Sequence, residues 1–303
     1  MATVLCIGQA VQDFVFSVDA MPDSAEKYRA SAFESIGGGP AATAAVAISS
    51  LGGAARLAAR TGDDPIADAV VAELESYGVD CTLVRRFANR TSSLSAVLVD
   101  SEGERLIVNY LDPAMETNAD WLPQQLPDGI DAVLADTRWP EGALHALQLA
   151  RKNDVPAVLD ADLPVPVDGE LVRTASHVAF SAAGLAQYSG DPDPASALLS
   201  VSDTTTAWCC VTLGSQGTLY MSNGDLCQIP AYEVEVRDTL GAGDVWHGAL
   251  ALALAEGQAL ATALQFASAA AALKVKNGGG RSGSPTRQEV DQFLQQHSHE
   301  GRP

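Results

Sequence analysis

Asp244 closes a run of small residues in the segment Asp238-Thr-Leu-Gly-Ala-Gly-Asp244, just before a stretch of helical composition, Val245–Glu256. A helix start exposes unpaired backbone N–H groups, which attract phosphate-like anions. The small residues that leave these amides accessible, and so form a candidate anion hole, are Gly241, Ala242 and Gly243. A carboxylate beside them can take the proton of an alcohol, so the segment predicts phosphoryl transfer to a hydroxyl. By itself, Asp244 would be an ordinary first-turn acid of a helix.

Two other glycine-rich segments predict close contact between backbone and a ligand. Three consecutive glycines stand in Ile36-Gly-Gly-Gly-Pro-Ala-Ala-Thr43, just before a helix that Pro40 begins. Thr212-Leu-Gly-Ser-Gln-Gly217 follows an apolar, strand-like run and is a candidate nucleotide loop. Each could also be a plain turn. No G-x-G-x-x-G sequence follows the first strand and the chain has no Walker A sequence, so neither fingerprint supports the nucleotide site.

Short apolar runs alternate with helical patterns along most of the chain, which predicts βαβ units around a mostly parallel sheet. The expected strands are Thr3–Ile7, Ala55–Ala59, Ala132–Ala135, Ala157–Leu159, His177–Phe180 and Trp208–Thr212, with Val234–Val236 as a further strand end. The expected helices are Pro40–Leu51, a segment from Asp64 to just before Gly78, Glu141–Asn153, Ala259–Lys276 and Thr286–His297. The fold class is therefore α/β.

Two pairs of segments do not follow this βαβ pattern. Their apolar and polar residues alternate, as in half-exposed strands. They are Phe14–Val18 with Tyr28–Ser35, and Leu94–Val99 with Arg105–Tyr110. We expect a small antiparallel β lid built from residues 13–35 and 93–111, whose apolar face covers a site or a second subunit. The main domain would comprise residues 1–12, 36–92 and 112–297, followed by a frayed tail at 298–303.

Composition limits the classes of partner. A chain of 303 residues with 47% apolar and 18% charged residues can fill the core of one large α/β domain. The formal net charge of −20 makes nucleic acid and anionic membranes poor partners. No apolar stretch is long enough to span a bilayer, and the N-terminus lacks the features of a signal peptide. Cys6, Cys81, Cys209, Cys210 and Cys227 show no metal-like spacing, which indicates a reduced, cytoplasmic protein.

The Asp238–Asp244 segment resembles the signature of the PfkB (ribokinase-like) carbohydrate kinases, and the two glycine-rich segments resemble other motifs of that family. The resemblance implies a three-layer α/β/α domain with a β lid, transfer of phosphate from ATP with Mg²⁺ to a sugar, and Asp244 as the base. It also implies sugar contacts by Asp13, Gly38 and Gly39. The implied ATP contacts are Thr212, Gly214, Gly217 and Gly243.

The chain departs from the family pattern at two of these motifs. Thr43 stands where an Asn usually follows the glycines. Ser181-Ala-Ala-Gly184 replaces an Asn-x-x-Glu stretch that helps to organise Mg²⁺ and phosphate, so we expect Mg²⁺ to be held mainly by ATP and water. Asp160 and Asp162 are candidate outer-shell partners of the metal or, equally, caps of a loop.

Within this family, further segments of the chain resemble the sulfofructose kinases. The similar blocks are Lys27, residues 37–47, residues 103–110 and residues 133–139. The resemblance implies phosphorylation of 6-deoxy-6-sulfofructose at its C1 hydroxyl, with the sulfonate recognised by Lys27, Asn109 and Arg138. An ammonium, an amide and a guanidinium suit a permanent anion with three acceptor oxygens. Alternatively, Lys27 is a solvated strand charge and Arg138 pairs with Asp136 or Glu141.

Other functions remain open at this point. The main alternative is a family kinase for another ketose, sugar phosphate or sugar acid, such as fructose, fructose 6-phosphate or 2-keto-3-deoxygluconate. A non-catalytic regulator with a kinase fold is a further alternative. We expect a homodimer through the lid. The family's monovalent-cation loop maps near Asp238 and Gly279–Ser284, but Gly283 stands where a side-chain ligand is expected, so the cation requirement stays open.

Overall fold

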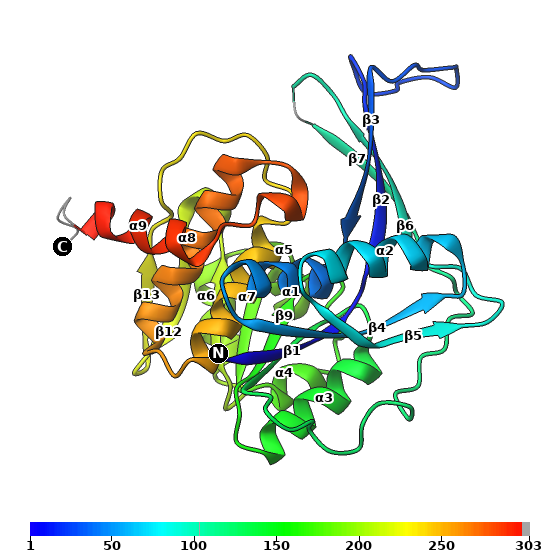
Figure 1. Cartoon of the computed structure of the whole chain (residues 1–303). Coiled ribbons are helices and arrows are strands. Elements are labelled where there is room, and N and C mark those ends of the chain that lie inside the picture. The colour runs from blue at the N-terminus through cyan, green and yellow to red at the C-terminus, as the bar shows by residue number, and fades with distance from the viewer. Residues whose placement is uncertain (103, 299–303) are drawn as a thin grey trace.

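A nine-stranded sheet crosses the main body of the computed structural model, which describes residues 1–102 and 104–298 (Figure 1). Its order is β13 (Asp225–Ile229), β12 (Thr218–Ser222), β11 (Trp208–Thr212), β10 (His177–Ser181), β9 (Ala157–Ala161), β8 (Ala132–Asp136), β1 (Thr3–Gly8), β4 (Ala54–Gly62) and β5 (Asp80–Phe87). The strands from β11 to β5 are parallel, whereas β12 and β13 form an antiparallel edge. The predicted mostly parallel sheet is therefore confirmed.

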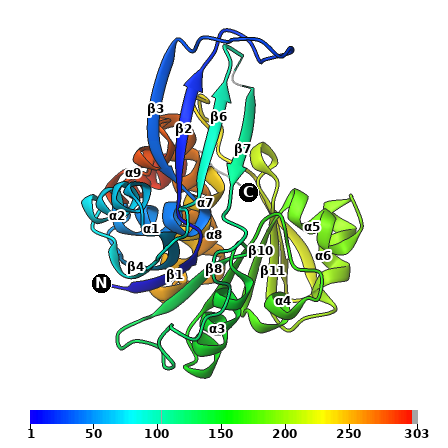
Figure 2. The same ribbon diagram turned by 90° about the vertical axis from the view of Figure 1, so that its right-hand side faces the viewer.

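Helices cover both faces of this sheet, as Figures 1 and 2 show. One face carries α1 (Pro40–Ser50), α2 (Pro65–Ser76), α7 (Ala242–Ala255), α8 (Leu260–Asn277) and α9 (Arg287–Ser298). The other carries α3 (Pro140–Lys152), α4 (Glu170–Thr174), α5 (Ala182–Ser189) and α6 (Pro194–Ser202). Alternate residues of β1 enter the two cores: Val4 and Cys6 on one side, Leu5 and Ile7 on the other.

The helix that carries Asp244 is fixed by very close packing against α1. A Cβ at Gly248 would lie 2.7 Å from the carbonyl oxygen of Ala44, so the approach of α7 to α1 requires a glycine there. The α7 residues from Val245 to Ala253 are all buried. Such a helix cannot shift sideways without disturbing a close-packed core, which gives Asp244 a rigid support.

The lid is a separate four-stranded sheet that projects from the main body (Figure 1). Its order is β3 (Ala32–Gly38), β2 (Val11–Ser17), β6 (Leu94–Val99) and β7 (Arg105–Tyr110). The two outer pairs are antiparallel, and the central pair β2–β6 is parallel. The predicted strand Tyr28–Ser35 is displaced: β3 begins at Ala32, so Lys27 lies on the exposed segment between β2 and β3 and not on a strand.

Other differences from the predictions are local. Strands β5, β12 and β13 were not predicted: β5 and β13 carry charged residues, and β12 is a short run between two glycine-containing turns. Residues 234–236 are not a strand. The predicted tail at 298–303 falls, after Ser298, outside the described residues.

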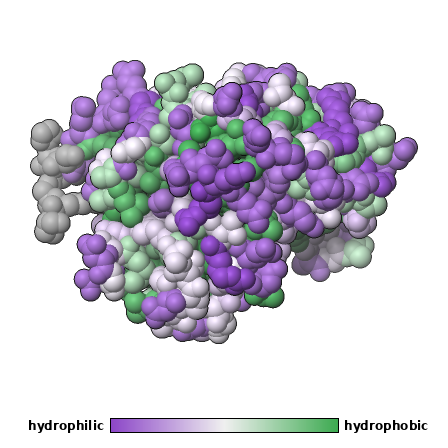
Figure 3. Space-filling model, turned by 90° about the horizontal axis from the view of Figure 1, so that it is seen from below, coloured by the Kyte–Doolittle hydropathy of each residue, from purple (hydrophilic) through white to green (hydrophobic). Residues whose placement is uncertain are grey.

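The surface of the main body is largely hydrophilic on the face seen from below, with scattered apolar patches (Figure 3). None of the helices in residues 1–102 and 104–298 is long and apolar enough to cross a membrane. All five cysteines are free thiols, and Cys6, Cys209 and Cys210 are buried in strands as predicted.

Candidate active site

The start of α7 forms the predicted turn, with Gly241 as the N-cap in a left-handed conformation (φ 77°). The amide of Ala242 donates to the carbonyl of Thr239 at 3.2 Å, and that of Val245 donates to Gly241 at 3.0 Å. Within the described residues, the amides of Gly241, Gly243 and Asp244 have no backbone partner. The donors available to an anion are therefore those of Gly241, Gly243 and Asp244, whereas the amide of Ala242 is engaged in the turn.

The carboxyl of Asp244 is poised for proton transfer near neutral pH. Burial, reinforced by the negative charge of Asp160, raises its pKa from 3.8 to about 7. His247 opposes this shift and stands one turn along α7, with Nδ1 at 2.7 Å from the Gly243 carbonyl oxygen. Burial lowers the pKa of His247 itself. A carboxyl whose pKa lies near the working pH is suited to act as a general base.

Asp160 at the end of β9 is the second unusual acid. Its side chain is 5% exposed, and its Oδ1 has no hydrogen-bond partner among the described residues. That oxygen lies 3.5 Å from Nε2 of His247. Burial, with the charges of Asp136 and Asp162, raises the pKa of Asp160 well above its usual range. A buried acceptor without a donor marks a place for a ligand or ion at the carboxyl ends of the strands.

Asp136 at the end of β8 organises the centre of the sheet. Its Oδ2 accepts the amides of Gln9 at 2.8 Å and Ala41 at 3.1 Å, and its Oδ1 accepts the amide of Arg138 at 2.8 Å. It thereby joins the end of β1 to the start of α1. A Cβ at Gly8 would lie 2.1 Å from Asp136 Oδ2, so only glycine fits. Asp136 is buried and is a structural residue that ties these backbone segments together.

Three polar residues on neighbouring strands lie side by side across the lid sheet and form a polar row. Asp13 on β2 is paired with Ser95 on β6, and Ser95 with Asn109 on β7. Asn109 Nδ2 donates to Ser95 Oγ at 3.0 Å, and Ser95 hydrogen-bonds the carboxylate of Asp13. A Cβ at Gly38 would lie 2.1 Å from Asp13 Oδ2. The structure thus brings Asp13, Asn109 and Gly38 together, and this set can bind sugar hydroxyls.

The structure places the two predicted cations apart. Arg138 lines a cavity of about 180 Å³ at the hinge of the lid, with Gly8 on its floor and Ser93 and Leu111 at the lid ends. Its Nη2 donates to Asp162 Oδ2 at 2.9 Å, so its partner is neither the side chain of Asp136 nor that of Glu141. Lys27 is exposed and does not line this cavity.

Sequence reasoning missed Arg60, a second guanidinium on the same cavity. Its Cζ lies 4.6 Å from the centre of the Trp139 ring, and its Nη1 donates to the carbonyl of Glu116 at 2.6 Å. Burial lowers its pKa. The available signal was an arginine beside the apolar residues Leu57, Ala58 and Ala59 of a predicted core strand, where a charge needs a specific partner.

Arg281 was also missed, although it explains the glycine run. Its side chain is buried beneath Gly37, where a Cβ would lie 1.5 Å from Nη2. It donates to the carbonyl of Gly38 at 3.4 Å and pairs with Glu73 at 3.4 Å. Thr43 is buried too, and its methyl group faces Gly241, so the family's usual Asn is replaced by an apolar contact with the anion turn.

A larger cavity of about 550 Å³ lies beside the anion turn and suits a nucleotide. All four predicted ATP contacts line it: Thr212, Gly214, Gly217 and Gly243. Tyr232, Val234 and Trp246 add apolar walls for a flat base. A Cβ at Gly217 (φ 90°) would lie 2.0 Å from the carbonyl oxygen of Ile229, which makes this glycine necessary. The cavity ends at Gly243, where the phosphates would meet the amides.

Metal ligands are sparse. In residues 1–102 and 104–298, no three His, Cys, Asp or Glu side chains gather as a metal site. Ser181 Oγ accepts the amide of Gly184 at 2.9 Å and caps α5, so the segment that replaces Asn-x-x-Glu begins a helix. At the predicted monovalent-cation loop, the ammonium of Lys274 lies 3.2 Å from Oδ2 of Asp238. Because this ammonium already stands beside the carboxylate, the residues do not fit a free monovalent cation there.

Comparisons with known proteins decide the family. The profile of the pfkB family carbohydrate kinases matches residues 1–287. The chain belongs to this family. It is 30% identical to a ribokinase of Bacillus subtilis over 97% of this chain and all of that one. Among solved structures, it resembles a candidate ribokinase from Agrobacterium tumefaciens at 34% identity and a TM-score of 0.92, covering 98% of this chain and 99% of that one.

The fold likeness extends to more distant pfkB kinases. Arabidopsis thaliana ribokinase, solved with ribose and ATP, has a TM-score of 0.83 at 24% identity, covering 97% of this chain and 99% of that one. The ribokinase-like fold predicted from the sequence is confirmed. As a pfkB kinase, the chain is an ATP-dependent phosphotransferase that acts on a sugar, which argues against the alternative of a non-catalytic regulator.

Proposed function

We propose that this kinase phosphorylates the C1 hydroxyl of 6-deoxy-6-sulfofructose. One observation carries the choice of an anionic sugar: two guanidiniums, Arg60 and Arg138, face one cavity at the lid hinge. The chain has only 18 Lys and Arg against 38 Asp and Glu. Two cations at the proposed sugar end of the site therefore indicate a specific role in binding an anion. A sulfonate offers three acceptors to such donors.

The lid supplies the rest of the proposed sugar site. Asn109 precedes the cavity residue Leu111 by two positions, so the polar row of Asp13, Ser95 and Asn109 is next to the hinge cavity. Hydroxyls of the sugar would meet Asp13 and the backbone at Gly38 and Gly39. Lys27 lies on the exposed lid segment and would reach the sulfonate when the lid closes. Closure also excludes water and limits hydrolysis of ATP.

In the proposed mechanism, Asp244 accepts the proton of the C1 hydroxyl as that oxygen attacks the γ-phosphorus of ATP in line, and the bond from this phosphorus to the β,γ-bridging oxygen breaks to release ADP. The amides of Gly243 and Asp244 donate to the oxygens on which negative charge increases. Asp162 and Asp160, whose Oδ1 has no hydrogen-bond partner among the described residues, are carboxylates of the kind that suit a hard cation such as Mg²⁺. The metal would be held mainly by ATP and water and would neutralise phosphate charge. Asp136 holds the end of β1 and the start of α1 together through the amides of Gln9 and Ala41.

A substrate panel tests the proposal. ADP release is measured with sulfofructose, fructose, fructose 6-phosphate, ribose and 2-keto-3-deoxygluconate at equal concentrations. We expect the highest kcat/KM for sulfofructose, and a higher value for another sugar would overturn the assignment. The second candidate is a neutral sugar, because Arg138 is already paired with Asp162 and the Bacillus subtilis relative is a ribokinase.

We also propose that the lid forms a homodimer interface in the cytoplasm. Strand β7 is the edge of the lid sheet, and it exposes Ile107, Val108 and Tyr110, followed by Leu111. An apolar edge strand of this kind favours pairing with a second copy. The free cysteines agree with a reduced compartment. Light scattering that gives the mass of a single chain at assay concentration would contradict the dimer.

A further inference from the structure

Lys274, near the end of α8, is a lysine with no solvent exposure. Its Nζ lies 3.2 Å from Oδ2 of Asp238 and 3.3 Å from the carbonyl oxygen of the same residue. A buried ammonium is costly unless it is paired and hydrogen-bonded. Its position is therefore specific, and Asp238 is the first residue of the segment that ends at Asp244.

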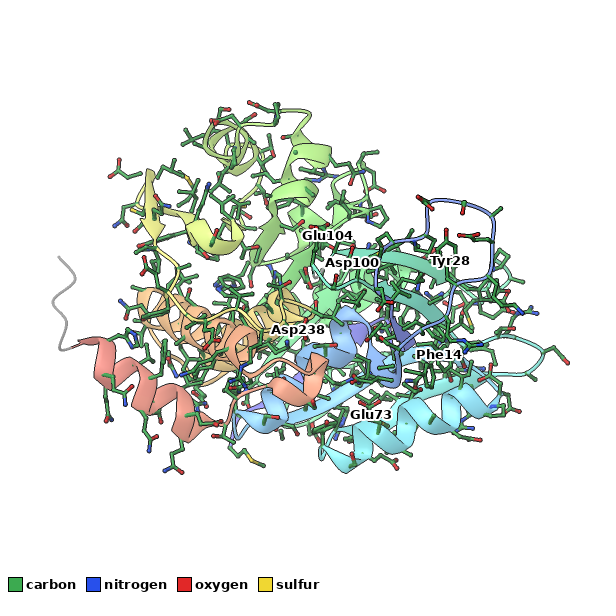
Figure 4. All side chains as sticks on the ribbon, turned by 90° about the horizontal axis from the view of Figure 1, so that it is seen from above. Phe14, Tyr28, Glu73, Asp100, Glu104 and Asp238 are labelled. Carbon is green, nitrogen blue, oxygen red and sulfur yellow. The ribbon has the colours of Figure 1, made fainter. Side chains whose placement is uncertain are left out.

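Asp238, which is labelled in Figure 4, joins three segments through its carboxylate. Its Oδ1 accepts the amide of Leu240 at 2.8 Å, which shapes the turn toward Gly241. Its Oδ2 accepts the amide of Gly280 at 3.0 Å, which holds the loop that follows α8. Burial opposes ionisation, but these hydrogen bonds and Lys274 together hold the pKa of Asp238 below its usual range. Asp238 thus stays ionised beside Lys274, and the two side chains bridge the turn, the helix end and the loop.

The space between these segments is already filled. A Cβ at Gly283 would lie 1.8 Å from the carbonyl oxygen of Gly278 and 3.3 Å from Cδ of Lys274. A side-chain oxygen at position 283 is therefore excluded, and the lysine stem passes along the glycine. A free cation beside Asp238 would face the Lys274 ammonium at short range and lack a ligand from 283. Charge repulsion and missing ligands both disfavour it.

We propose that the ammonium of Lys274 is a built-in monovalent cation that fixes the Asp238–Asp244 segment and makes the kinase independent of potassium. Lys274 is a positioning residue, because it acts through Asp238 on the amides of Gly243 and Asp244. The proposal rests on the kinase activity of the chain and not on which sugar it takes. Any sugar that the wild-type enzyme phosphorylates serves for the test.

The first test uses the unaltered protein. Phosphoryl transfer is measured in a choline-buffered solution with and without potassium chloride, at constant ionic strength. We expect the same kcat with both salts. Activation by potassium of about tenfold or more would overturn the proposal, because a filled cation site cannot respond in this way.

The second test restores the missing charge in a variant. Lys274→Ala leaves space beside Asp238, whereas Lys274→Met fills the space without a charge. We expect both to lose kcat by about tenfold or more because the half-buried carboxylate of Asp238 loses its cationic partner. Potassium or ammonium should restore kcat in Lys274→Ala but not in Lys274→Met. A purely structural role would lower the melting temperature of both variants without any rescue.

Lys276→Met is the matched control, because Lys276 is exposed on the same helix. It should keep the kcat of the wild type and show no response to potassium. A folded Lys274→Ala variant that no monovalent cation activates would overturn the proposal. If the Lys274 variants fail to fold, the potassium test on the wild-type enzyme still decides.

Discussion

Arg138 donates to Asp162 across 2.9 Å at the hinge of the lid. The side chains come from the segments that follow the neighbouring strands β8 and β9, so the guanidinium is held in place before any substrate arrives. Asp162 uses one of the donor directions of Arg138, and the planar guanidinium has others for an anion. The pairing orients the cation toward the hinge cavity that Arg138 lines.

Arg138→Ala should raise the KM for sulfofructose by about 10- to 100-fold, since a charge-assisted hydrogen bond is lost. The KM for ATP should change by less than about threefold, because the nucleotide cavity lies elsewhere. Steady-state kinetics with each substrate varied in turn measure both constants. Arg151→Ala, an exposed arginine on α3, is the control and should change neither. Equal effects of Arg138→Ala on both constants would argue against a sulfonate contact.

Asn109→Asp should distinguish charged from neutral sugars. The new carboxylate stands beside Ser95 and Asp13 and repels a sulfonate, while it can still accept hydroxyl hydrogen bonds. We expect kcat/KM for sulfofructose to fall by about tenfold more than kcat/KM for fructose. A parallel loss for both sugars would mean that Asn109 contacts only hydroxyls.

Gly217→Ala should weaken ATP binding. Its Cβ would lie 2.0 Å from the carbonyl oxygen of Ile229, so the loop at the nucleotide cavity must move. We expect the KM for ATP to rise by about tenfold, with a smaller change for the sugar. Gly224→Ala is a matched control, because Gly224 has a similar φ (89°) but open space around its Cα and no place on the cavity. Similar kinetics for the two variants would contradict the nucleotide assignment.

The sequence was sufficient for the elements that local patterns determine. Apart from β5, the parallel strands have continuous apolar runs, and the turn before α7 and the loop after β11 have characteristic glycines, so these elements were predicted at nearly the observed positions. Arg60, Lys274 and Arg281 were not foreseen. Lys274 and Arg281 are buried and Arg60 is half-buried, and each has a partner far away in the chain, such as Asp238 for Lys274. The periodicity of apolar residues in the sequence does not indicate such pairs, so they are found only in the folded structure.

The activity should depend on pH through Asp244. Because its pKa is raised to about 7, the carboxyl is protonated below that pH and cannot accept the proton of the alcohol. We expect kcat/KM to fall as the pH is lowered through this region and to level off above it. Asp160→Asn removes a negative charge that raises the pKa of Asp244, so the acidic limb should move to lower pH. Asp203→Asn, on the exposed surface, should leave the profile unchanged.

The role of Asp244 as the base is tested most directly by measuring both the turnover number and the sugar affinity of Asp244→Asn. The amide has nearly the same shape but cannot accept the proton, so kcat should fall by about 10²- to 10⁴-fold. Calorimetry should show sugar affinity within about threefold of the wild type, because the polar row on the lid is intact. Near-normal turnover in this variant would contradict the assignment of Asp244 as the base.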